Sequence, residues 1–279
     1  MSAPAVGANP WLVGLIVPMD GGEGGASGWP PSAESFNSRP LFPGAGIDWV
    51  NNHLVQAIVG AALVIAFWLW MANKQKIVPG KKQFLGEQFY DLLRNGIARD
   101  ILGHDYRKFL PYLIALFSFI LVNNLFGQFF LFMFPTFSKI GYAWGLSLCT
   151  FVLYNVAGIR KHGLLRYLKQ MTLPAGVPWP LWFLIIPLEF VSNFITRPVS
   201  LALRLFANLF AGHLVVMVFV LGGSLLLATG NALYGIAGGV SLLFAFPIFA
   251  LELFVGTLQA YIFTVLTAQY VLSAVADEH

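Results

Sequence analysis

One arginine stands inside a long apolar stretch of this sequence. The stretch from Arg197 to His213 reads RPVSLALRLFANLFAGH, and no lysine or arginine follows Arg204. An arginine side chain does not lose its proton in a protein, and placing it in lipid costs at least about 2.5 kcal/mol. Because a charged group at that depth marks an ion pathway by default, Arg204 is the first candidate functional residue.

A histidine and a carboxylate accompany this arginine on the last two apolar segments. In an antiparallel hairpin that turns at Gly230, His213 lies near the depth of Glu252. Arg204 lies near the depth of Gln259 with a similar offset, about one helical turn. Since histidine titrates near neutral pH, a histidine beside a carboxylate can relay a proton. An interhelical hydrogen bond without a transport role is the alternative.

Helical spacing separates these groups into two environments. Ser200, Arg204, Asn208 and Ala211 share one face of a helix by the i, i+4, i+7 rule. His213 falls on the opposite face, because each residue advances the helix by about 100°. One helix therefore presents two distinct polar surfaces.

Structural alternatives remain for several polar residues. Arg204 would be structural if it paired with a carboxylate of its own chain or reached the lipid headgroups, and Arg197 beside Pro198 is expected to be structural. Glu189 could instead be a residue at the membrane interface without a transport role. The amides of Asn123 and Asn124 also suit hydrogen bonding between packed helices.

Composition identifies the elements that must hold these residues. Of 279 residues, 58% are hydrophobic and 10% charged, whereas soluble domains are about 25% charged. We therefore predict an all-α polytopic membrane protein with about five crossings. The net charge of +4 arises from basic loops, which argues against nucleic-acid binding. The single cysteine, Cys149, permits no intrachain disulfide or cysteine-cluster metal site, and we predict no metal or cofactor.

The chain divides into four parts. Residues 1–46 are rich in Gly, Pro and Ser and are expected to form an extracytoplasmic or interfacial arm without a cleaved signal peptide. Residues 47–180 should contain three transmembrane helices, and residues 181–276 a long, steeply tilted helical hairpin. Residues 277–279 form a tail. The predicted spans are Leu54–Ala72, Phe109–Phe134, Ile140–Ala157, Leu181–Ala228 and Ala232–Ala276.

The last two spans and the basic loops define the topology. Each of the last two spans would reach about 70 Å as a continuous helix, roughly twice the thickness of the bilayer core. Each must therefore tilt or break, and Pro187, Pro198 and Pro247 are the expected kinks. Basic clusters within residues 73–108 and 160–169 mark cytoplasmic loops, so the N-terminus should lie outside and the C-terminus in the cytoplasm.

Two motifs resemble subunit a of the F-type ATP synthase, the stator subunit that conducts ions beside the rotating c-ring. They are PVSLALRLFANLFAGH from Pro198 and TLQAYIFTVL from Thr257. The resemblance is strong over about residues 185–276 and looser over 47–180, where the topology and NNLFG from Asn123 agree. It implies a bacterial plasma membrane protein whose partners are the c-ring, peripheral stalk b-type subunits, membrane lipids and protons.

By this resemblance, Arg204 faces a c-ring carboxylate, with Asn208 and Gln259 beside it. The family's best-known version has a carboxylate in place of His213 and a histidine in place of Glu252, so the pair is exchanged here. The chain also lacks the family's proline soon after the NNLFG motif. We assign proton translocation to Arg204, Asn208, His213, Glu252, Gln259 and Glu189, and half-channel lining to Ser200, Asn193, Asn123, Asn124 and Gln269.

The resemblance also implies a mechanism. Protons enter from outside near His213 and Glu252, protonate the c-ring, and leave by a cytoplasmic half-channel after nearly a full rotation, while Arg204 separates the two paths. The coupling ion, H⁺ or Na⁺, stays open, because the c-ring largely binds it. With no Walker-type GxxxxGK[ST] or nucleophile motif, the chain itself should not be an enzyme.

Two other functions would use the same buried charges. A stand-alone proton or cation channel or antiporter should transport ions without partners. A membrane subunit of a respiratory complex would depend on redox centres in its partners, since this sequence offers no evident haem or cluster site.

Overall fold

The computed structural model describes residue 31 and residues 51–73, 80–128, 135–173 and 179–276, and the regular elements in these ranges are helices. Five helical stretches are long and apolar enough to cross a membrane, which confirms the prediction of an all-α polytopic membrane protein. The tail at 277–279 and the arm at 1–46, apart from residue 31, lie outside the described residues. The five stretches are Asn52–Ala72, Gln83–Phe126, Ile140–His162, Trp179–Ala228 and Ala232–Val275.

A side chain caps the start of helix α2 (Asn52–Ala72). The Oδ1 atom of Asn51 accepts a hydrogen bond from the backbone N–H of Leu54 at 2.9 Å, an ordinary N-cap arrangement. The same oxygen accepts a 3.0 Å hydrogen bond from the hydroxyl of Tyr142. One side chain thus begins α2 and joins it to the start of the third span.

The second span is part of a longer helical stretch with two irregular turns. Its π-helical turn η2 contains Ile97, which is fully buried and follows the fully buried Leu93. After α5 the chain enters a short 3-10 turn whose three residues are all buried. The elements are α3 (Lys81–Leu93), η2 (Arg94–Arg99), α4 (Asp100–Leu102), η3 (Gly103–Asp105), α5 (Tyr106–Phe126) and η4 (Thr136–Ser138).

Helix α6 (Ile140–His162) is the third span, and α7 (Leu164–Thr172) follows it immediately. The connection is Gly163, whose φ of 80° lies in the left-handed region that glycine enters without steric cost. Tyr167 of α7 then folds back over α6 and donates a hydrogen bond from its hydroxyl to Asn155 Oδ1 at 3.0 Å. The chain therefore reverses at once after its third crossing.

The last two spans form the predicted hairpin. Its first arm consists of η5 (Trp179–Leu181), α8 (Trp182–Phe190), the π-helical turn η6 (Val191–Thr196) and α9 (Arg197–Ala228), and its second arm is α10 (Ala232–Val275). Gly230 makes the turn with a φ of 70°, and the Asn231 side chain caps α10 by accepting the N–H of Leu233.

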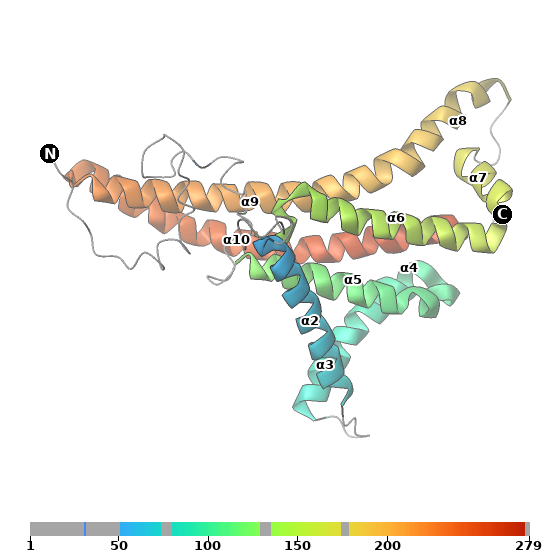
Figure 1. Cartoon of the computed structure of the whole chain (residues 1–279), viewed down its shortest axis with the longest axis horizontal. Helices are drawn as coiled ribbons and strands as arrows, with labels where there is room; N and C mark the ends of the chain where they lie inside the picture. The colour runs from blue at the N-terminus through green and yellow to red at the C-terminus, as the bar shows by residue number, and fades with distance from the viewer. Residues whose placement is uncertain (1–30, 32–50, 74–79, 129–134, 174–178, 277–279) are drawn as a thin grey trace, which may run out of the picture.

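The irregularity of the hairpin lies between two of the three prolines. The π-helical turn η6 separates Pro187 from Pro198, and Figure 1 shows α8 leaving the line of α9 at this point. Pro187 removes one backbone donor and Pro198 crowds the preceding turn, both of which loosen regular hydrogen bonding there. Helix α10, by contrast, continues through Pro247 without interruption.

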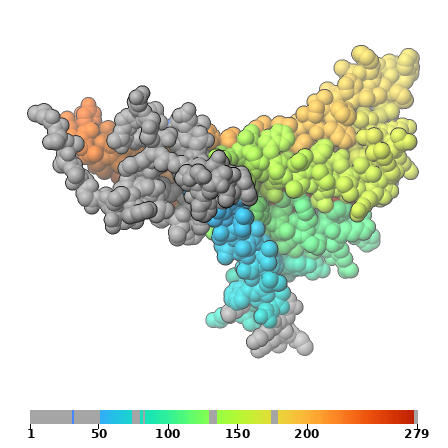
Figure 2. Space-filling view, viewed as in Figure 1, coloured from blue at the N-terminus to red at the C-terminus, as the bar shows by residue number. Residues whose placement is uncertain are grey.

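The helices do not share one direction. Figure 1 shows α2 lying across the line of the α9–α10 hairpin, while α5 and α6 run alongside α10. Helices that cross in this way cannot all stand along the membrane normal. The hairpin arms are also too long for an upright crossing of a core of about 30 Å. In Figure 2 the α2–α3 region and α8 project from the central bundle.

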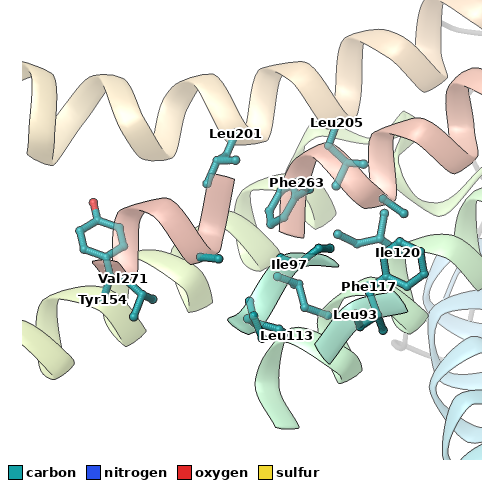
Figure 3. Close-up of a cluster of buried hydrophobic side chains, with 14 of the residues drawn as sticks. Leu93, Ile97, Leu113, Phe117, Ile120, Tyr154, Leu201, Leu205, Phe263 and Val271 are labelled. Atoms are coloured by element: carbon teal, nitrogen blue, oxygen red, sulfur yellow. The ribbon is translucent and has the colours of Figure 1, made fainter. Parts of the chain in front are cut away.

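An apolar core holds α5, η2, α9 and α10 together. Figure 3 shows its side chains meeting between these elements, among them Ile97, Ile120, Leu205 and Phe263, each fully buried. Closer to the hairpin turn the helices touch through glycine, since a Cβ on Gly238 would lie 2.7 Å from a backbone oxygen. Small residues at such contacts let transmembrane helices approach closely.

Gly158→Ala should prevent stable folding of the subunit. The added methyl would lie 2.2 Å from the Tyr167 ring and 2.9 Å from the Ala274 carbonyl oxygen, distances that force a shift of α7 or α10. The matched control is Gly145→Ala on the same helix, where the methyl meets nothing within 4 Å. Immunoblots of membranes should show a several-fold loss of subunit for Gly158→Ala only. Equal amounts for both variants would contradict this packing account.

Candidate functional site

Arg204 lies on an open face of α9. Its side chain is exposed, as are Ala207, Asn208 and Ala211 on the same face. Within the described ranges its guanidinium forms no hydrogen bond and no ion pair. The structural alternative, a carboxylate partner in the same chain, is therefore not found among the described residues. Neighbouring alanines leave the charge accessible to another helix at close range.

Asn208 connects this face to α10. Its Nδ2 atom donates a hydrogen bond to Oε1 of Gln259 at 2.8 Å, and the Gln259 side chain is buried. The sequence placed Arg204 near the depth of Gln259; in the structure Gln259 bonds to Asn208, one helical turn beyond Arg204. The two amides fix the register of α9 and α10 at the level of the arginine.

His213 and Glu252 meet on the opposite, buried face of α9. Nδ1 of His213 lies 3.4 Å from Oε1 of Glu252, and both side chains are at least nine-tenths buried. Neither carboxylate oxygen accepts a hydrogen bond from any residue in the described ranges. A contact this long is weaker than a well-formed hydrogen bond. The pair predicted from spacing is therefore present, with carboxylate oxygens left to accept a proton.

Gly212 makes room for this carboxylate. A Cβ at that position would lie 3.1 Å from Cγ and 3.3 Å from Oε1 of Glu252, closer than most side-chain contacts. The glycine lets α10 bring its glutamate against the α9 backbone. The two helices therefore approach each other closely where the ionisable pair lies.

A second polar group lies around the π-helical turn η6. Nδ2 of Asn193 donates to Oε2 of Glu189 at 3.1 Å and to the Met171 carbonyl oxygen at 2.6 Å. The hydroxyl of Tyr154 donates to the Asn193 carbonyl oxygen at 3.0 Å. Asn193 thereby joins α7, α6 and the first hairpin arm, and it holds a half-buried carboxylate. Such π-helical turns are frequent at functional sites.

The two asparagines of α5 contribute contacts between helices. Asn123 accepts a 2.9 Å hydrogen bond from the Thr136 hydroxyl, and Asn124 donates one of 2.8 Å to the Gly256 carbonyl oxygen of α10. Gly256 lies one turn beyond Glu252, so Asn124 packs close to the ionisable pair. These amides bond between helices as the packing alternative expects.

The other predicted lining residues lie apart from these groups. The half-buried Ser200 donates its hydroxyl to the Arg197 carbonyl oxygen at 3.0 Å. Gln269 is exposed on α10. Arg197 is held by a 2.8 Å hydrogen bond to Ser273 Oγ and lies over the Tyr270 ring, as expected of a structural residue. The structure brings none of these three into contact with the His213 pair.

Sequence reasoning passed over two buried polar residues of α2. His53 and Gln56 are almost fully buried, and the His53 ring lies 6.2 Å from that of Tyr142. Their i, i+3 spacing in an otherwise apolar span is a signal that they share a protein-facing side. The sequence shows that both residues are polar, but it does not show which helix they face.

The comparisons with known proteins agree with this architecture. The family model described as ATP synthase A chain matches residues 54–272. A protein of Nocardioides sp. named ATP synthase subunit a is 47% identical over 239 residues, covering 86% of this chain and 87% of the relative. One of Pseudarthrobacter chlorophenolicus with the same name is 39% identical over 259 residues, covering 90% and 94%. Five membrane-spanning stretches and this extended similarity establish that the chain belongs to the ATP synthase A chain family.

Proposed function

We propose that this chain is the proton-conducting stator subunit of an F-type ATP synthase, offering protons two offset half-channels to the c-ring carboxylates. The observation that carries the proposal is Arg204, a permanent cation on an open helix face with no partner among the described residues. An uncompensated cation at that depth needs a counter-charge from another subunit. A rotor carboxylate supplies that counter-charge transiently.

Arg204 acts through electrostatics. At a separation of about 4 Å and an effective dielectric constant of about 20, opposite unit charges attract by about 4 kcal/mol. The arginine therefore favours the ionised form of a carboxylate beside it and repels a proton crossing directly between the paths. Because no covalent bond forms, the rotor can move on. The exposed alanines at 207 and 211 allow the rotor helix to approach closely.

The two polar groups supply the separate paths. His213 and Glu252 relay protons from the outer side, about 13 Å along the helix from Arg204. Glu189 and Asn193 belong to the cytoplasmic path on the other side of the arginine, about 22 Å away at Glu189. A proton must therefore travel on the rotor between the two groups. Each elementary charge that crosses 100 mV supplies about 2.3 kcal/mol for that rotation.

The setting follows from the same role. The subunit spans the bacterial plasma membrane with its N-terminus outside and its C-terminus in the cytoplasm, as the basic loops indicate. It contacts the c-ring through α9 and α10 and is held by peripheral stalk b-type subunits. The chain conducts and does not itself catalyse; ATP chemistry belongs to the head of the complex.

The proposal is tested by proton flux into liposomes under a membrane potential. Liposomes with the subunit alone should stay as tight as empty ones, whereas liposomes with the subunit and its c-ring should conduct protons. The reason is that Arg204 blocks the direct route, so a proton crosses only on a moving carboxylate. Conduction by the subunit alone would contradict the proposal and favour a stand-alone channel.

A further inference from the structure

A cavity of about 460 Å³ opens at one end of the bundle, away from the polar groups described above. It lies where α5 begins and where α6 and α10 end. Its polar wall consists of Asp105, Lys108, Arg160 and Lys161, and its apolar wall includes Leu153 and Val156. Three cations and one carboxylate leave the cavity with an excess of positive charge.

The three cationic side chains of this cavity differ in their hydrogen bonds and ion pairs. Nζ of Lys108 lies 2.8 Å from Oδ1 of Asp105 in an exposed ion pair. Nζ of Lys161 donates a hydrogen bond to the Val275 carbonyl oxygen at 2.7 Å. Arg160 is exposed and has no hydrogen bond or ion pair within the described part of the chain. The guanidinium is thus available to an anion, and its planar fork suits two phosphate oxygens.

An apolar ridge leads along α6 to this arginine. Trp144, Leu148, Val152 and Val156 recur every four residues and are 37%, 55%, 52% and 40% exposed, and Arg160 is the next position of the row. The ridge is about 18 Å long, close to half the thickness of a hydrocarbon core of about 30 Å. An acyl chain of one leaflet has that length.

We infer that this cavity binds the headgroup of an anionic phospholipid, whose phosphodiester contacts Arg160 while an acyl chain lies along the α6 ridge. The inference needs both the cationic wall of the cavity and the apolar ridge of α6. The cations alone would suit any soluble phosphate, and the ridge alone would suit any lipid. Basic pockets between transmembrane helices near a membrane surface are suited to anionic headgroups.

The inference is tested by photo-crosslinking in the intact ATP synthase reconstituted into vesicles. Two probes are compared: phosphatidylglycerol and phosphatidylcholine, each with the same photoreactive group on an acyl chain. Phosphatidylglycerol should label the α6 peptide that ends at Arg160 in clear preference to phosphatidylcholine. Arg160→Gln should lower that labelling about fivefold, and Lys108→Gln should lower it by a similar factor.

The matched control is Arg166→Gln, an exposed arginine of α7 that does not line the cavity; its labelling should equal that of the unchanged complex. Proton pumping should persist in all three variants, so failure here is separable from failure of the proposed function. Equal labelling by both probes, or undiminished labelling in Arg160→Gln, would overturn the inference. Loss of label with excess inorganic phosphate would assign a soluble anion, and crosslinks to another subunit or to residues 277–279 would assign a protein occupant; either result also overturns it.

Discussion

Arg204→Ala is expected to abolish ATP-driven proton pumping in inverted membrane vesicles while ATP hydrolysis by the detached head continues. The substitution removes the exposed guanidinium of α9, so nothing favours an ionised rotor carboxylate at the boundary between the paths. The rate of ATP-driven proton pumping should fall by at least about a hundredfold, as when a dominant electrostatic group is lost. The rate of proton pumping is measured by the quenching of a pH-sensitive dye after ATP is added.

Folding and assembly need a separate control in this experiment. Arg204 is exposed and has no hydrogen bond or ion pair among the described residues, so its removal breaks no such interaction there. The amount of subunit in the membrane should therefore be unchanged. Arg166→Ala removes another exposed arginine, on α7, and should leave pumping intact. Normal pumping by Arg204→Ala, at normal subunit amounts, would refute the proposed mechanism.

Glu252→Gln is expected to slow proton flow at least about tenfold and to change its pH dependence. Glutamine keeps the size and buried position of the side chain but cannot bind or release a proton, which a relay requires. Passive proton flow through head-stripped vesicles, measured over a range of pH, reports both effects. An unchanged rate and profile would reduce the His213 pair to a packing contact.

The exchanged pair offers a sharper version of this test. In His213→Glu combined with Glu252→His, the two side chains swap helices but a histidine still meets a carboxylate. The double variant should recover most of the flow that His213→Glu alone loses, because two carboxylates at 3.4 Å repel each other. The control is Glu87→Gln, an exposed carboxylate of α3, which should conduct normally. Equal defects in the single and double variants would contradict a relay.

The sequence was sufficient for the membrane class and for the helices themselves. Hydropathy over each span depends only on local composition, and the helical rise converts span length into reach, so five spans and a hairpin turning at Gly230 were predicted and are confirmed. The same helical geometry predicted that Arg204 and His213 occupy opposite faces of α9. Their burial bears this out: Arg204 is exposed and His213 buried.

What the sequence left open was how one helix meets the next. Proline positions suggested kinks at three places, yet α10 continues through Pro247 and the π-helical turn η6 lies between Pro187 and Pro198, because a kink depends on how neighbours satisfy the freed backbone groups. Likewise, the bond from Asn193 to the Met171 carbonyl oxygen joins segments that no local pattern relates. The roles assigned to the polar residues stay predictions that the experiments above decide.

The sequence by itself determined that a permanent positive charge lies in an apolar helix, because residue type and hydropathy are local properties that do not depend on contacts with other helices. Only the tertiary structure decided that this charge faces outward and that Asn208 pairs with Gln259. The physical reason is that rotation and register between helices are set by interhelical packing, here by close glycine contacts such as Gly212 against Glu252. Periodicity within one helix carries no information about that packing.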